Sequence, residues 1–229
     1  MKRTLITTAD GSHSLYVKDL DEHYHSIHGA IQEALHVFIK SGLQYMHNKN
    51  YQEINILEIG FGTGLNALLT YLEAEKLNIK INYTGLEAFP LEDNLLKELN
   101  YAEWIANLFH HEKKNVKKIF EQLHSSEWQK DVTISEHFKL NKINNTLQDV
   151  QLTRTFDLIY FDAFGPRVQP DMWEDELFSK IYSATTTNGC LVTYCAKGEV
   201  KRSLKRIGFK VETLPGPPRK REMVRGIKE

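Results

Sequence analysis

Three alternating glycines constrain this chain more than any other feature. Ile54, Ile56, Leu57 and Ile59 precede them and place apolar side chains at both odd and even positions, as expected for a strand buried on both faces of a parallel sheet. Gly60, Gly62 and Gly64 follow, and glycine permits the positive φ and close backbone approach that a ligand-binding turn needs. The next residues place leucines at helical spacing: Leu65, Leu68, Leu69 and Leu72. The stretch predicts a strand, a nucleotide-binding turn and a helix.

The spacing of the glycines separates two kinds of nucleotide site. A dinucleotide fingerprint has its third glycine three residues after the second, and that position here is Leu65. The remaining pattern, Glu58-x-Gly-x-Gly-x-Gly, resembles the first motif of class I S-adenosylmethionine-dependent methyltransferases. This resemblance implies a Rossmann-like α/β fold.

Length and charge fit one α/β domain with additions. The 229 residues include 29 Lys or Arg and 30 Asp or Glu, so any RNA contact must come from a local patch. Cys190 and Cys195 have an odd spacing in an apolar stretch, which points them to opposite faces and argues against a disulfide. No signal peptide opens the chain and no apolar run approaches the ~20 residues of a membrane span, so we expect a cytoplasmic protein.

Residues 1–46 are predicted to form an N-terminal extension. Asp10-Gly11 is a strong turn between two short apolar segments and indicates a hairpin, and residues 30–46 have the periodicity of an amphipathic helix. Between them, His23, His25 and His28 suggest either a metal site, a solvated turn or the rim of a substrate pocket. No nearby cysteine or second histidine cluster completes a coordination sphere, so we expect no metal.

Two acidic residues end predicted strands. Glu87 ends the strand over residues 79–86, and ligands of a doubly wound sheet bind beyond the carboxyl ends of its strands. Glu87 can accept hydrogen bonds from both ribose hydroxyls, the alternative being a helix N-terminal carboxylate before Pro90. Asp162 follows the strand over residues 156–161, where a methyltransferase carboxylate faces the sulfonium methyl group. Phe164 and Pro166 can form an apolar wall beside it.

The segments between and after these strands complete the predicted sheet. Residues 91–128 form a helical insertion whose lysines at 113–118 either face RNA or form a solvated helix face. Residues 132–150 indicate a weak strand or two ending near Asp149, where methyltransferases usually contact the adenine amino group. Further strands over 191–194, from Gly208 and over 223–227 predict a seven-stranded, mostly parallel sheet in a single domain, residues 1–229.

The combined motifs resemble the methyltransferase domain of the MnmC-like tRNA modification enzymes. The likeness covers nearly the whole chain and rests on separated blocks, among them residues 8–12, 24–33, 57–66, 161–173, 197–200 and 220–223. It implies methyl transfer from S-adenosylmethionine to the amine of 5-aminomethyluridine at the tRNA wobble position, by a free-standing enzyme without an oxidase domain. We expect tRNA to bind through its anticodon region, with no membrane partner.

The resemblance implies roles for particular residues. Asp162 is the expected catalytic residue, because it can orient the substrate amine. The expected cofactor-binding residues are Glu58, Gly60, Phe61, Gly62, Thr63, Gly64, Asn66, Glu87, Asp149 and Asp162. The expected substrate-binding residues are Tyr24, Glu33, Phe164, Pro166, Lys220 and Arg221. Two other functions stay open, a methyltransferase acting on a small-molecule amine and a catalytically silent RNA-binding module. The sequence does not indicate an oligomeric state.

Overall fold

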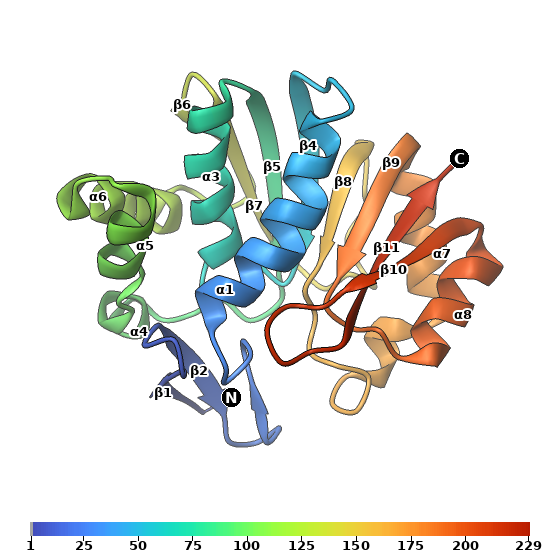
Figure 1. Ribbon diagram of the computed structural model, residues 1–229, viewed down its shortest axis with the longest axis horizontal. Helices are drawn as coiled ribbons and strands as arrows, with labels where there is room; N and C mark the ends of the chain where they lie inside the picture. The colour runs from blue at the N-terminus through green and yellow to red at the C-terminus, as the bar shows by residue number, and fades with distance from the viewer. Residues whose placement is uncertain (1) are drawn as a thin grey trace.

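The computed structural model describes residues 2–229 and places one large sheet at the centre of the molecule (Figure 1). The strand order is β10-β11-β9-β8-β4-β5-β7-β6. Adjacent strands from β9 to β7 run parallel, whereas β10, β11 and β6 pair antiparallel with their neighbours. The strands are β4 Glu53–Ile59, β5 Lys80–Glu87, β6 Asp131–Ser135, β7 Phe138–Asn144, β8 Phe156–Phe161, β9 Thr185–Thr193, β10 Phe209–Pro215 and β11 Glu222–Lys228.

The strand order reverses between β4 and β8. The chain goes from β4 through β5 to β7 on one side of the sheet and returns to β8 on the other side. Ligands of such sheets bind in the crevice beyond the carboxyl ends of the strands at this switch point. The predicted Rossmann-like fold is confirmed, and the switch point lies between the glycine turn and Asp162.

The sheet differs from the prediction in three places. Within residues 2–229 it has eight strands and not seven, because β6 forms a hairpin with β7 and adds an antiparallel edge. The third parallel strand, β7, ends at Asn144 and not near Asp149, and its alternate residues Phe138, Leu140 and Lys142 are buried. A lysine at a buried position conceals the alternating pattern. β9 begins at Thr185, before the predicted start, and its pairing with β8 shifts register.

The N-terminal extension has the predicted hairpin and helix. A separate small sheet contains β1 Arg3–Thr7, β2 His13–Val17 and β3 Glu22–His23. One continuous helical run follows, with α1 Ala30–Ala34, the π-helix η1 Leu35–Leu43 and α2 Gln44–His47. Figure 1 shows this run in blue, crossing in front of the central strands.

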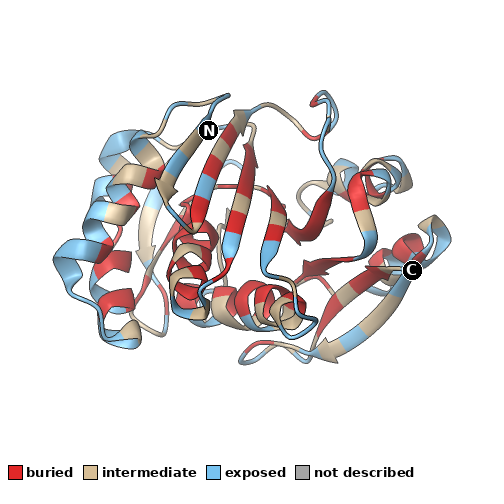
Figure 2. Ribbon diagram, turned by 90° about the horizontal axis from the view of Figure 1, so that it is seen from above, coloured by how far each residue is buried: buried red, intermediate tan, exposed pale blue. Residues whose placement is uncertain are grey.

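Helices cover both faces of the sheet, so the core forms two layers. On one face, η1 and α3 (Leu65–Leu77) pack on alternate strand residues such as Ile56 and Tyr160. On the other, α7 (Asp175–Ala184) and α8 (Gly198–Ile207) pack on the intervening residues, such as Leu57 and Phe161. The remaining helices are α4 Asp93–Glu98, α5 Tyr101–Phe109, α6 Lys113–Ser125 and the 3-10 helix η2 Pro170–Trp173. Figure 2 shows the buried residues concentrated on the strands and on the helix faces against them.

Cys190 and Cys195 lie in different core layers, as their odd spacing predicts, and both are free thiols. Within residues 2–229, no helix has the length and apolar character needed to cross a membrane.

Candidate active site

The glycine turn after β4 requires glycine for two reasons. Gly60, Gly62 and Gly64 have φ values of 91°, 49° and 70°, a region that side chains with a Cβ rarely adopt. A Cβ at Gly60 would also lie 2.8 Å from the carbonyl oxygen of Asp162. The backbone N–H groups of Gly60 and Phe61 both donate to the carbonyl of Leu86, at 3.0 Å, which ties the turn to β5. The turn is therefore held tightly between β5 and the residue after β8.

A cavity of about 450 Å³ opens beside this turn. Its walls come from the carboxyl ends of β4, β5 and β8, together with the small N-terminal sheet and the loop after β7. The lining residues are Arg3, Tyr24, His25, Ile59, Gly60, Phe61, Gly62, Thr63, Leu65, Asn66, Leu86, Glu87, Ala88, Phe89, Asn145, Thr146, Leu147, Gln148, Asp149, Asp162, Ala163, Phe164, Gln169, Asp171 and Met172. Every predicted cofactor-binding residue except the buried Glu58 and Gly64 lines this cavity.

Glu87 is fixed in the cavity wall by the backbone. One carboxylate oxygen accepts a hydrogen bond from Gly62 N–H and the other from Phe89 N–H, each at 2.8 Å. Helix α4 begins at Asp93, beyond Pro90, and Glu92 is its N-cap. Glu87 is therefore not a helix cap, and each of its oxygens retains a lone pair for a hydroxyl donor.

The side-chain amide of Asn66 joins two carboxylates. Its Nδ2 donates to Glu58 Oε1 and to Asp162 Oδ2, both at 2.9 Å. Burial raises the pKa of Glu58 well above its ordinary value, and burial raises the pKa of Asp162 to about 7, with a further contribution from the charge of Glu33. Asp162 is therefore poised to exchange a proton near neutral pH.

Asn66 also tests whether the site fits a cofactor with a cationic group. The amide oxygen of Asn66 is buried, and within residues 2–229 it has no hydrogen-bond partner. Unpaired buried acceptors are costly, so they indicate donors that bind there. S-adenosylmethionine carries an ammonium group that can donate to such an acceptor. The glycines of the turn also allow a ligand to approach the backbone closely. These residues therefore fit that cofactor.

The apolar wall opposite the glycine turn is formed by Tyr24 and Phe164. Their rings meet edge to face with centroids 5.2 Å apart. Tyr24 also lies 3.3 Å from the position that a Cβ on Gly62 would occupy, and its hydroxyl accepts a hydrogen bond from Nε of Arg3 at 3.0 Å. The predicted neighbour Pro166 is partly buried but does not line the cavity.

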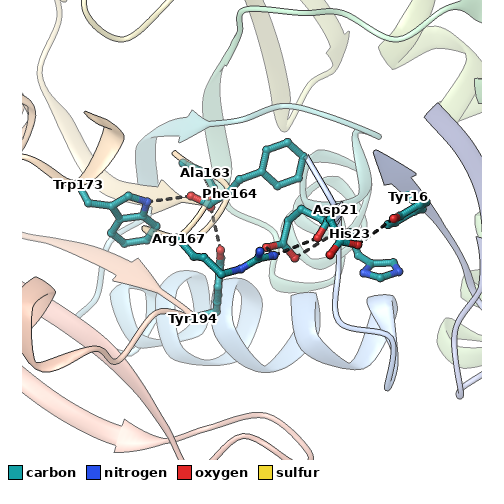
Figure 3. A network of polar contacts seen from close by, with 9 residues as sticks. Tyr16, Asp21, His23, Ala163, Phe164, Arg167, Trp173 and Tyr194 are labelled. Carbon is teal, nitrogen blue, oxygen red and sulfur yellow. Dashed lines mark hydrogen bonds and ion pairs between the residues drawn. The ribbon is translucent and has the colours of Figure 1, made fainter. Parts of the chain in front are cut away.

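Two carbonyl hydrogen bonds hold the chain after Asp162 (Figure 3). The hydroxyl of Tyr194 donates to the carbonyl of Ala163 at 2.9 Å, and Nε1 of Trp173 donates to the carbonyl of Phe164 at 2.8 Å. Arg167 extends the same loop to the small N-terminal sheet, where it donates to the carbonyl of Asp21 at 3.0 Å. The loop that presents Asp162 and Phe164 is thereby fixed from two sides.

Glu33 and Lys220 form an ion pair, and neither of them lines the cavity, nor does Arg221. The other oxygen of Glu33 accepts a hydrogen bond from Ser26 N–H at 2.8 Å, and Lys220 Nζ also lies 4.4 Å from the centre of the Tyr194 ring. Arg221 next to Lys220 is 93% exposed. The two residues predicted to contact substrate therefore differ, because Lys220 has partners inside the protein and Arg221 faces solvent.

Asp149 lies in the cavity wall without belonging to a strand. It follows β7 by a short loop, is exposed, and accepts a hydrogen bond from Oγ1 of Thr146 at 2.8 Å. Every residue of the segment 145–149 lines the cavity. An adenine contact by Asp149 stays a prediction.

The N-terminal histidines are separated by the fold. His25 contacts Ser14 Oγ at 3.0 Å, and burial lowers the pKa of His25 to about 4. His28 is 3.3 Å from Nη1 of Arg219. In the part of the chain that the structure describes, residues 2–229, no cluster of three or more His, Cys, Asp or Glu side chains could hold a metal ion.

Among the residues that sequence reasoning missed are Arg3, which lines the cavity, and Tyr194, which holds the loop after Asp162. Arg3 reaches the cavity from β1 and donates to the carbonyl of Phe89 at 2.5 Å as well as to Tyr24. No local signal marks it, because its partners lie far along the chain. Tyr194 had a usable signal, since it directly follows β9, whose carboxyl end neighbours that of β8.

The reversed strand order, the glycine turn and the acidic residues at the carboxyl ends of β5 and β8 define a class I S-adenosylmethionine-dependent methyltransferase. The family model described as S-adenosyl-L-methionine-dependent methyltransferase matches residues 103–229, more than half of the chain. The chain belongs to this family, and S-adenosylmethionine is its cofactor.

Relatives and solved structures agree with this assignment. The tRNA 5-methylaminomethyl-2-thiouridine biosynthesis bifunctional protein MnmC of Leptospira interrogans is 29% identical over 215 residues, covering 91% of this chain and 33% of the relative. The protein of that name from Leptospira borgpetersenii is 30% identical over 220 residues, covering 90% and 32%. The chain thus spans about a third of the length of the curated relatives it matches. The crystal structure of MNMC2 from Aquifex aeolicus has a TM-score of 0.78 at 25% identity and covers 98% of this chain and 70% of its own.

Proposed function

We propose that this protein methylates the primary amine of 5-aminomethyluridine at the wobble position of tRNA and yields 5-methylaminomethyluridine. Residues 1–229 would act as a single methyltransferase domain. The names of the relatives and the likeness to the Aquifex aeolicus structure support the choice of substrate. The observation that carries the chemistry is Asp162, a carboxylate whose pKa is raised to about 7, at the cavity wall beside the glycine turn.

The cofactor, when bound, supplies an electrophilic methyl group on a sulfonium. The residues of this chain would align it with the acceptor and exclude water, which is the main requirement of an in-line displacement. Glu87 would hold the ribose, and the amide oxygen of Asn66 would offer an acceptor to the ammonium group, with Glu58 holding the Asn66 side chain in place. Tyr24 and Phe164 would form the apolar side of the uridine pocket.

Asp162 would prepare the amine for attack. An alkylamine is mostly protonated at neutral pH, taking the lysine value of ~10.4 as an analogue. An ionised Asp162 would accept one proton from the ammonium and so free the nitrogen lone pair for the methyl group that the cofactor would supply. Asp162 would then release its proton to solvent, and in its ionised form it would stabilise the positive charge on the methylated nitrogen. A carboxyl group with a pKa near 7 is a better base at neutral pH than an exposed aspartate.

The anticodon region of tRNA is the partner that this proposal requires. Arg219 and Arg221 are exposed on the turn between β10 and β11. Arg219 lies 3.3 Å from Nδ1 of His28, and Lys220 between the two arginines pairs with Glu33. Phosphate contacts by these arginines would weaken tRNA binding steeply as salt rises.

The test is methyl transfer from labelled S-adenosylmethionine to tRNA that carries unmethylated 5-aminomethyluridine, followed by digestion and identification of the nucleoside. We expect label in 5-methylaminomethyluridine. Cofactor binding without label in any tRNA would favour a small-molecule amine as acceptor. A failure to bind S-adenosylmethionine would instead indicate a silent RNA-binding module.

A further inference from the structure

Lys220 sits where a phosphate-binding lysine is not expected. Its side chain is 32% exposed and reaches Glu33 from the turn between β10 and β11, whereas the Arg221 side chain is 93% exposed and Arg219 is exposed as well. Backbone hydrogen bonds from Gly216 to Arg221 at 3.2 Å and from Lys220 to Pro217 at 2.9 Å close this turn. The closed turn therefore holds the Lys220 backbone where its amine reaches Glu33.

The partners of Lys220 connect it to Asp162 by two routes. Lys220 pairs with Glu33, a residue of α1 that is 8% exposed and whose charge acts on Asp162. Lys220 also lies over the Tyr194 ring at 4.4 Å, and the Tyr194 hydroxyl holds the carbonyl of Ala163, the residue after Asp162. The geometry therefore places Lys220, with Glu33 as its ion-pair partner, one aromatic ring away from the residue after Asp162.

We propose that Lys220 and Glu33 are positioning residues that together set the charge state of Asp162, and that Lys220 does not bind RNA phosphate. The proposal rests on the proposed function, because it assigns a role within the same reaction. Unpaired Glu33 would favour a protonated Asp162, and unpaired Lys220 would favour an ionised one. The ion pair keeps both influences balanced.

Other groups near Asp162 do not replace this pair. Asn66 donates one hydrogen bond to Asp162, and beyond Asn66 lies Glu58, whose raised pKa favours its neutral form. Tyr194 and Tyr83 have pKa values raised well above the ordinary range, so both stay neutral near pH 7. His25, whose pKa is lowered to about 4, is likewise neutral there, and Glu87 lies across the cavity on β5. The remaining charges on Asp162 are those of Glu33 and Lys220.

The test is the pH profile of single-turnover methyl transfer at saturating tRNA and S-adenosylmethionine. In Lys220→Met we expect the acid limb to move about one unit higher, and in Glu33→Gln about one unit lower. In the double variant the two shifts should cancel, and Lys220→Arg should restore the wild-type profile. Lys210→Met is the matched control, because it removes an exposed ion pair with Glu229 on the far end of the same hairpin.

Two results would overturn the proposal. An unmoved profile in Lys220→Met, with a raised KM for tRNA and a smaller salt dependence, would assign Lys220 to a phosphate contact. Losses of the same sign at every pH in both single variants, adding in the double variant, would indicate a structural role alone. If Lys220→Met fails to fold, the downward shift in Glu33→Gln decides the question, because that variant keeps the lysine.

A readout without turnover separates this proposal from the proposed function. The side-chain carboxyl carbon of Asp162, assigned by comparison with Asp162→Asn, can be titrated by carbon NMR in each variant. The same opposite shifts are expected there. If wild-type protein does not methylate tRNA but these shifts appear, the substrate assignment fails and the role of the ion pair stands. If the protein methylates tRNA but the titration of Asp162 is the same in every variant, the role of the ion pair fails and the substrate assignment stands.

Discussion

Replacing Gly60 with alanine should damage cofactor binding more than any other single methyl addition to the turn, because no side chain can move to make room. The new Cβ would lie 2.8 Å from the backbone oxygen of Asp162, and Gly60 has a φ of 91°. By contrast, the nearest atom to a Cβ at Gly62 is in the Tyr24 ring at 3.3 Å, and at Gly64 it is the Nε2 end of His124 at 2.7 Å.

The size of the effect follows from two costs. A left-handed backbone costs a residue with a Cβ about 1–2 kcal/mol. Overpacking against atoms that cannot rotate away adds about 1–3 kcal/mol. The variant can reduce these costs only by moving the turn away from β8, which separates the turn from Asp162. Since 1.4 kcal/mol corresponds to a tenfold change, we expect the affinity for S-adenosylmethionine to fall by about 30-fold or more.

Isothermal titration with S-adenosylmethionine would measure this loss, with circular dichroism establishing that the variant is folded at the titration temperature. Gly198→Ala is the matched control, since Gly198 is the first residue of α8, lacks a positive φ and faces only the end of the Arg202 side chain. We expect the control to bind as the wild type does. A dissociation constant for Gly60→Ala within twofold of wild type would refute the packing argument.

Two further predictions concern protonation. Asp162→Asn should keep cofactor affinity within about threefold and lower single-turnover methyl transfer by ~10²–10⁴-fold, the usual contribution of a general base; equal losses of both would refute the catalytic role. In urea unfolding, the same variant should be more stable than wild type at pH 8, by at most ~4 kcal/mol, and no more stable at pH 4. The reason is that the raised pKa of Asp162 favours a proton in the folded state, so the stability of the wild type falls as pH rises toward 7. His124, whose pKa burial lowers to about 4, acts oppositely, because its contribution to stability is present above pH 6.5 and lost as pH falls through 4. His124→Gln should therefore lose less stability than wild type between pH 7 and pH 4, and equal losses would contradict this.

The cofactor side of the site could be predicted because its signals are local in the sequence. The glycine turn lies between the strand that precedes it and the helix that follows it, so one short stretch of sequence contains all three elements of the cofactor-binding motif. Glu87 and Asp162 end strands that are apolar enough to recognise, and the fold rule for parallel sheets brings those ends together. The same reasoning did not locate the end of strand β7, because Lys142 occupies a buried position. Its amine donates a hydrogen bond to the carbonyl of His124 and lies 4.7 Å from the centre of the Trp128 ring.

The acceptor side is different, because its residues come from segments that only tertiary structure brings together. Glu33 on α1 and Lys220 in the last hairpin are separated by most of the chain, yet they form an ion pair beside Asp162. In the sequence, Lys220-Arg221 is a basic dipeptide in a basic loop, and such a pattern favours a nucleic-acid contact for both residues. Lys220 and Arg221 differ because the closed turn projects their side chains in different directions, and because Lys220 meets the buried carboxylate of Glu33. A charged residue that meets its partner inside the protein acts on the local charge balance, so the same sequence motif can supply one residue for the chemistry and its neighbour for the RNA.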